Sequence, residues 1–113
     1  PSAQRNTAHH SQQLQLLPLL QLIHTYLKED GLFFLLLPYK RQKEIEAFLA
    51  QTGLYVYTQV TAHASTGHPP FRLLIKGGKQ QKEKETFSIS IKDSNNQYTP
   101  EFVELLKDYY LYL

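Results

Sequence analysis

A run of six consecutive apolar residues, at positions 32–37, lies between Gly31 and Pro38. A strand with one face in water alternates apolar and polar residues, and this run does not alternate. The glycine and the proline limit the run to the length of an ordinary strand. We therefore expect an internal strand that is covered on both faces, with residues 39–41 directly beyond its carboxyl end.

Helix-like patterns flank this strand on both sides. Leucine and isoleucine recur at steps of three and four residues between positions 16 and 29, and Pro18 is tolerated because it falls in the first turn. Residues 43–51 carry a second amphipathic pattern, and Gly53 suits the left-handed cap that ends such a helix. The helix–strand–helix order is typical of an α/β unit, in which ligands bind at the carboxyl ends of parallel strands.

The rest of the chain predicts further strands and a closing helix. Patterns of β-forming and turn-forming residues predict strands at 54–61, 71–76 and 87–91, a loop at 62–70 and a turn at 93–96. Thr99 can cap a final helix with Pro100 in its first position, and the apolar residues 109–113 are expected to dock onto the body. The expected fold class is α/β, with one parallel crossover followed by antiparallel strands and a closing helix.

Composition limits the class of protein. The chain has 113 residues, which is one small domain or part of a larger one, and 42% hydrophobic residues allow a core. No apolar run is long enough to span a membrane and no secretory pattern opens the chain, so we expect a cytoplasmic location. The absence of cysteine excludes disulfides and thiolate metal sites, and the five histidines lack metal-binding spacing. The chain contains no methionine and starts at Pro1, so we expect it to be processed or a fragment.

Four stretches of the sequence carry a family resemblance. They are RNTAHH at 5–10, KEDGLFFLLLP at 28–38, PPFRLLI at 69–75 and YTPEFVELLKDYYLYL at 98–113. They are similar to the R-x-x-A-R-H, K-x-G-G-x-F-x-x-V-L-P, P-x-R-V-L-L and Y-[ST]-x-E-[YF]…F-Y-L motifs of the bacterial tRNA(Val) adenine-N6 methyltransferases. The chain thus resembles the carboxyl half of a class I, S-adenosylmethionine-dependent methyltransferase.

The resemblance implies a Rossmann-like methyltransferase sheet. Residues 1–15 would be a loop that follows the catalytic motif, and residues 16–113 would be the α/β body. The family's N-P-P-[YF] catalytic motif, its Gly-rich cofactor turn and the acidic residue that ends its second strand do not occur in the sequence. We therefore expect a parent enzyme that methylates the N6 amine of a tRNA adenine with S-adenosylmethionine, and a chain that is inactive alone. The alternative is a stand-alone basic α/β module that binds RNA or a protein without catalysis.

The resemblance places several candidate RNA contacts on a substrate-facing rim. Cations meet phosphates and aromatic rings stack on unpaired bases, which suits a mildly basic chain of formal charge +2. Arg5 lies closest to the missing motif, and His9 takes the place of the family's second arginine. The candidates are Arg5, His9, Tyr39, Lys40, Arg41 and His68.

Structural roles remain open for these candidates. Lys40 and Arg41 can belong to an exposed first helical turn with Glu44 and Glu46 as partners, and the histidines of the 62–70 loop can be plain loop residues. A further expectation concerns assembly. The strand at 32–37 would have lost a neighbour on one side, and an open apolar edge favours self-association.

Overall fold

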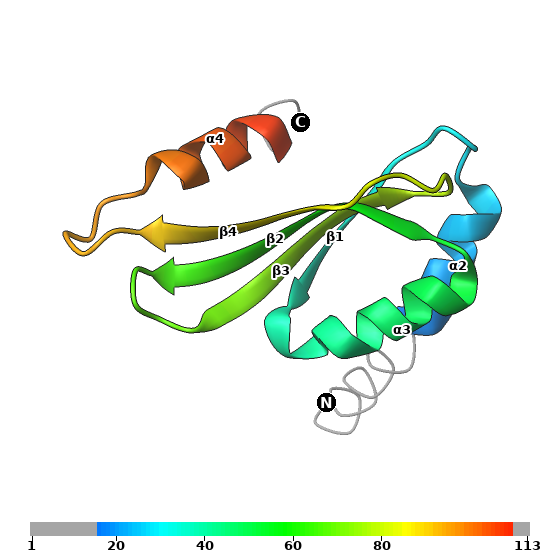
Figure 1. The fold of residues 1–113 in the computed structure, drawn as a ribbon, viewed down its shortest axis with the longest axis horizontal. Helices are drawn as coiled ribbons and strands as arrows, with labels where there is room; N and C mark the ends of the chain where they lie inside the picture. Colours follow the sequence, from blue (N-terminus) through cyan, green and yellow to red (C-terminus); the bar gives the residue numbers. More distant parts are fainter. Residues whose placement is uncertain (1–15, 110–113) are drawn as a thin grey trace, which may run out of the picture.

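The computed structural model describes residues 16–109, with side chains as far as Lys107. Four strands form one open sheet, with helices against both of its faces (Figure 1). In chain order the elements are α2 (Leu16–Tyr26), β1 (Phe33–Pro38), the short 3-10 helix η1 (Tyr39–Arg41), α3 (Gln42–Thr52), β2 (Tyr55–Ser65), β3 (Pro70–Gly78), β4 (Glu85–Lys92) and α4 (Pro100–Tyr109). The mixed α/β class, with a closing helix, is confirmed.

The strand order across the sheet is β1-β3-β2-β4. β1 and β2 run in the same direction, as the predicted crossover through α3 requires, but β3 lies between them and is antiparallel to both. β4 pairs with β2 in parallel, so the loop between β3 and β4 passes the amino end of β2. The carboxyl ends of β1 and β2 therefore lie at the same end of the sheet.

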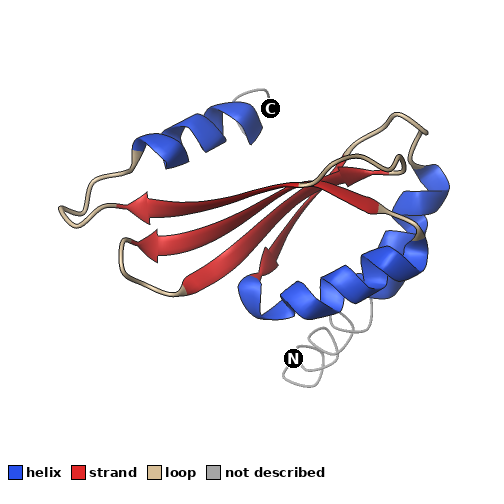
Figure 2. Ribbon diagram, viewed as in Figure 1, coloured by secondary structure: helices blue, strands red, loops and turns tan. Residues whose placement is uncertain are grey.

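The two faces of the sheet carry separate cores. Helices α2 and α3 cover one face, and α4 covers part of the other (Figure 2). Strand β3 serves both cores because successive side chains point to opposite faces: Leu73 and Ile75 lie in the first core, and Leu74 packs against the second. Full burial of an aliphatic side chain of this size stabilises the fold by about 2 kcal/mol.

The expectation that the apolar strand is covered on both faces is wrong for the described residues. Phe33 is buried against α2 and α3, whereas Phe34 and Leu36 are 55% and 56% exposed on the opposite face. Helix α4 packs over Val60 and Ile89, on β2 and β4, and leaves that side of β1 uncovered. The predicted open edge is present, since β1 is an edge strand of the sheet that residues 16–109 form.

Local sequence chemistry sets the ends of the elements. Gly53 caps α3 with a φ of 75°, as predicted. The Thr99 hydroxyl accepts a hydrogen bond of 3.2 Å from the Phe102 amide and donates to the Ser90 carbonyl, so it caps α4 and ties that helix to β4. The loop at 62–70 is shorter than predicted, because β2 extends to Ser65 and β3 begins at Pro70.

No helix within residues 16–109 is both long and apolar enough to cross a lipid bilayer.

Candidate functional site

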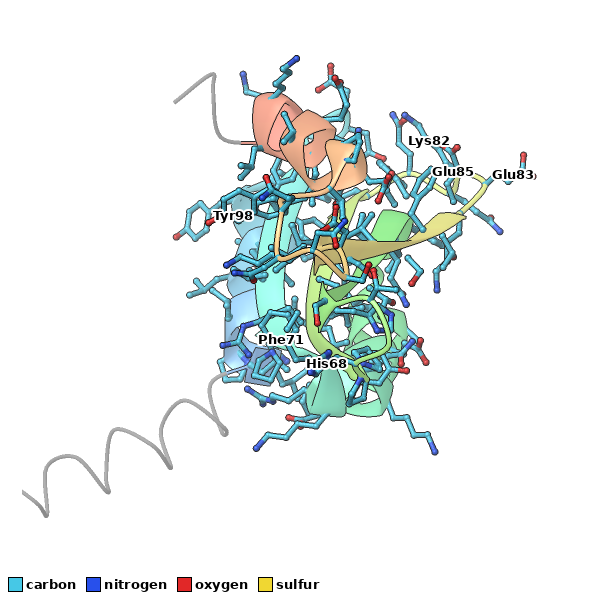
Figure 3. The ribbon with its side chains drawn as sticks, turned by 90° about the vertical axis from the view of Figure 1, so that its left-hand side faces the viewer. His68, Phe71, Lys82, Glu83, Glu85 and Tyr98 are labelled. Carbon is cyan, nitrogen blue, oxygen red and sulfur yellow. The ribbon has the colours of Figure 1, made fainter. Side chains whose placement is uncertain are left out.

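The candidate site is the end of the sheet where β1, β2 and β4 finish and β3 begins. We call this end the rim and define it by residues 38–41, 63–72 and 92–98. Figure 3 looks onto the rim, with His68, Phe71 and Tyr98 toward the viewer. Each strand reaches the rim with polar or aromatic side chains, so the sheet brings together segments that are far apart in the sequence.

Arg41 is held in a structural ion pair. Its guanidinium lies 2.6 Å from one oxygen of Glu44, and its Nε donates to the other oxygen at 3.3 Å. The hydrogen bond from Arg41 is the main reason why the pKa of the Glu44 carboxyl lies below its usual value. The pairing with Glu44 that the sequence left open is therefore present for Arg41, and it fixes the first turn of α3.

Tyr39 and Lys40 line a cleft at the rim. The cleft has a volume of about 400 Å³, and its other walls are Pro38, Pro70, Phe71 and Arg72. Pro38 is the ladder partner of Arg72, which brings the segment after β1 against the start of β3. Lys40 is exposed and forms no ion pair with any residue in the described range 16–109.

Phe71 and Arg72 were not among the residues predicted for the site. The Arg72 guanidinium carbon lies 5.1 Å from the centroid of the Phe71 ring, and both side chains are exposed. The sequence predicted that both residues lie inside a strand. Nothing in the sequence distinguished their side chains from the side chains of the sheet core. Only the antiparallel return of β3 to the carboxyl end of β1 would have indicated their position.

The two histidines of the β2–β3 hairpin are bound into it. His63 Nδ1 lies 2.7 Å from the carbonyl oxygen of His68, and His63 Nε2 lies 3.1 Å from the Ser88 hydroxyl. Because the carbonyl oxygen only accepts, we assign the proton to Nδ1, which leaves Nε2 to accept from Ser88. His68 Nδ1 in turn lies 2.5 Å from the Ser65 hydroxyl. His63 thus joins β2 to β4, whereas His68 is exposed at the hairpin tip.

A further cation reaches the rim at the end of β4. Lys92 Nζ lies 5.3 Å from the centroid of the Tyr98 ring. The nearby Asp93 carboxylate accepts hydrogen bonds from the amides of Asn95 and Gln97, at 2.8 and 3.0 Å. Since Glu44 and Asp93 are both engaged, the charges of Lys40, Arg72 and Lys92 have no carboxylate partner within residues 16–109. Such a basic, aromatic rim favours a polyanion.

The described residues offer little for a metal or a cofactor. No group of three or more His, Asp or Glu side chains within residues 16–109 could hold a metal ion. The carboxylates of Asp93, at the rim, and of Glu44, in the first turn of α3 beside it, are already bound by protein donors. Arg5 and His9 lie outside the residues that the structure describes.

The comparison with solved structures concerns the fold. A crystal structure described as a predicted O-methyltransferase from Agrobacterium tumefaciens superposes with a TM-score of 0.53 and 23% sequence identity. The match covers 69% of this chain and 38% of that one. The likeness supports the predicted Rossmann-like fold.

The comparison with curated proteins confirms the family resemblance seen in the sequence. Proteins named tRNA1(Val) (adenine(37)-N6)-methyltransferase are similar along nearly the whole chain. The one from Pectobacterium carotovorum is 31% identical over 112 residues, which is 99% of this chain and 45% of the relative. Those from Photorhabdus laumondii and Yersinia enterocolitica are 32% and 30% identical over 83% and 95% of this chain. The chain spans less than half the length of these relatives. No protein-family model matches it.

Proposed function

We propose that this chain forms part of an S-adenosylmethionine-dependent methyltransferase that acts on the N6 amine of an adenine in tRNA. The carrying observation is the similarity to curated tRNA adenine-N6 methyltransferases, at 31% identity over 99% of the chain. In this proposal residues 1–113 supply the carboxyl part of the methyltransferase domain, which is the sheet core and the rim that faces the substrate. A cytoplasmic location follows from a tRNA substrate.

The rim supports an RNA substrate. Lys40, Arg72 and Lys92 are cations without carboxylate partners in the described part of the chain, and exposed aromatic rings accompany them. Tyr39, Lys40 and His68 are the proposed RNA contacts among the described residues. Arg41 contributes positive charge from within its ion pair with Glu44. Arg5 and His9 remain proposed contacts from residues 1–15.

The cofactor is assigned to the rest of the enzyme. S-adenosylmethionine would supply the methyl group. The rim does not fit it, because the Asp93 carboxylate there and the neighbouring Glu44 carboxylate already accept hydrogen bonds from backbone amides and from Arg41. The Gly-rich turn and the N-P-P-[YF] motif are also missing from the sequence. We propose that both motifs lie in the part of the enzyme that corresponds to the unmatched part of these relatives.

The test is methyl transfer with two protein forms. Full-length protein from the source gene should transfer a labelled methyl group to the N6 amine of a tRNA adenine, and the 113-residue chain should neither transfer it nor bind the cofactor in calorimetry. Micromolar cofactor binding by the chain alone would contradict the division of roles. A full-length protein that binds tRNA and transfers no methyl group would favour the alternative, a basic α/β module without catalysis.

Self-association of the isolated chain is a separate part of the proposal. The exposed side chains of Phe34 and Leu36 adjoin the open edge of β1. An apolar edge strand of this kind pairs with another chain. Sedimentation of the 113-residue chain should show dimers or larger species as concentration rises, and a monomer at every concentration would contradict this.

A further inference from the structure

The cleft between η1 and the start of β3 combines an aromatic ring with a planar cation. Phe71 is 37% exposed, and the guanidinium of Arg72 lies over its ring at 5.1 Å from the centroid. Aromatic rings and guanidinium planes are the two surfaces on which proteins stack unpaired bases. The pair therefore places an exposed aromatic ring and a positive charge side by side in the lining of a cleft.

Lys40, from η1, also lines this cleft and adds a second positive charge to it. It is exposed, and it has no acidic partner within residues 16–109. An ammonium group binds phosphate as a point charge, so Lys40 suits the backbone phosphate of a nucleotide whose base lies against Phe71 and Arg72. The volume of about 400 Å³ is at the small end of the range for ligand sites, and suits one nucleotide.

The other pairs of a cation and an aromatic ring lack this combination. Lys92 lies over the Tyr98 ring, but that ring is already stacked on Phe102 with 5.5 Å between the ring centroids. Lys82 lies over the ring of Tyr57, and that ring is buried. At Phe71 an exposed ring and a cleft coincide.

We infer that this cleft binds one unpaired nucleotide of the RNA substrate, in the strand beside the target adenine. The base lies against the Phe71 ring and the Arg72 guanidinium, and the phosphate lies at Lys40. A paired nucleotide does not fit, because a duplex keeps both faces of its bases covered. The assignment rests on the proposed function, and it makes Phe71 and Arg72 substrate-binding residues that position the strand without taking part in methyl transfer.

The experiment measures binding of a fluorescein-labelled RNA hairpin, with adenine in its single-stranded loop, to the 113-residue chain. Phe71→Leu removes the ring, and Phe87→Leu is the matched control because Phe87 is also exposed but lies near the start of β4, toward the other end of the sheet. Phe71→Leu should weaken binding about tenfold, the usual effect of losing one base–aromatic stack. Phe87→Leu should leave the affinity unchanged.

Two further variants test the charges. Arg72→Gln should weaken binding to a similar degree as Phe71→Leu, whereas the control Lys82→Gln, at the other end of the sheet, should not. Lys40→Gln should lower the slope of log affinity against log salt by about 0.7, the contribution of one phosphate contact on a single strand. A fully paired RNA of the same length should show no dependence on Phe71.

Three outcomes would overturn the assignment. The first is that Phe71→Leu and Arg72→Gln both bind the hairpin as tightly as the wild-type chain. The second is that Phe87→Leu weakens binding as much as Phe71→Leu does. The third is that Phe71→Leu weakens binding of the fully paired RNA as much as binding of the hairpin. Circular dichroism and thermal midpoints verify that each variant is folded, and Arg72→Gln repeats the test should Phe71→Leu unfold.

Methylation by the full-length protein separates the two proposals. A full-length protein without methyl transfer refutes the proposed function while hairpin binding still reports on the cleft, and normal methylation by Phe71→Leu refutes the cleft alone.

Discussion

The two ends of the sheet carry the same kinds of side chain in different environments. At the far end, the loop between β3 and β4 holds Lys79 and Lys82 against the body: Lys79 Nζ donates to the Leu27 carbonyl at 3.1 Å, and Lys82 Nζ lies 4.9 Å from the Tyr57 ring centroid. At the rim, Lys40 and Arg72 have no carboxylate partner among residues 16–109 and line a cleft. Lysine-rich sequence alone therefore does not identify a binding surface. The difference lies in the aromatic residues beside the cations, because Tyr57 at the far end is buried whereas Phe71 at the rim is exposed.

If the far end is structural, its tightest contact should carry the largest stability effect. A Cβ on Gly77 would lie 2.2 Å from the Tyr55 carbonyl oxygen and 2.7 Å from the Phe33 ring. Because backbone is among these neighbours, Gly77→Ala should destabilise the fold by about 3 kcal/mol or more. Urea denaturation measures this, with Gln81→Ala in the exposed loop as the control. A Gly77→Ala protein as stable as wild type would show that the strands separate easily here.

The next effect is a single hydrogen bond at the same end. The Tyr57 hydroxyl accepts from the Gln80 amide at 2.9 Å, and its ring is 8% exposed. Tyr57→Phe should cost about 1 kcal/mol of stability, because it leaves that amide without its partner. Hairpin RNA binding should not change. Weaker RNA binding with unchanged stability would reverse the assignment of the two ends.

The rim should show the opposite behaviour. Lys92→Gln removes a partly exposed cation whose contact is the Tyr98 ring, so stability should change by less than about 0.5 kcal/mol. RNA binding should weaken and its salt slope should fall by about 0.7, if the charge meets a phosphate. Lys107→Gln is the control, because Lys107 is paired with Glu104 on α4 at 3.4 Å. Equal effects of the two variants would mean that net charge, and not the rim, governs binding.

The smallest effect is the pH dependence of the ion pair beside the cleft. The hydrogen bond from Arg41 lowers the pKa of Glu44 in the folded protein below its usual 4.5. A lowered folded pKa adds stability that is present above the unfolded pKa and is lost as pH falls through the folded one. Since 38% of the Glu44 side chain is exposed, the amount is a few tenths of a kcal/mol. Thermal midpoints of wild type and Glu44→Gln should differ at pH 7 and converge under acid conditions. A difference in thermal midpoint that persists in acid would exclude the ion pair as the cause of that difference.

Local chemistry made much of the fold predictable. The helix ends at Gly53, Thr99 and Pro100 were predicted correctly, because helix caps depend on neighbouring backbone groups. Coverage of β1 could not be read from its residues, since it depends on where α4 lies on the other face. The sequence predicted Tyr39 and Lys40 as site residues because they follow a strand, and their role in binding stays a prediction. Phe71 and Arg72 were missed because their site exists only once β3 returns beside β1.

The parallel pairing of β2 with β4 has a consequence for the order of folding. It joins residues as distant as Thr58 and Glu85, whereas β2 and β3 meet through a short hairpin. Distant pairing must pay a larger loop-closure entropy before it gains contacts, so it forms late. We expect the β2–β3 hairpin to form first, and β4 with α4 to join afterwards through the Thr99 and His63 contacts. Pulse-labelled hydrogen exchange should then protect β3 amides before those of β4.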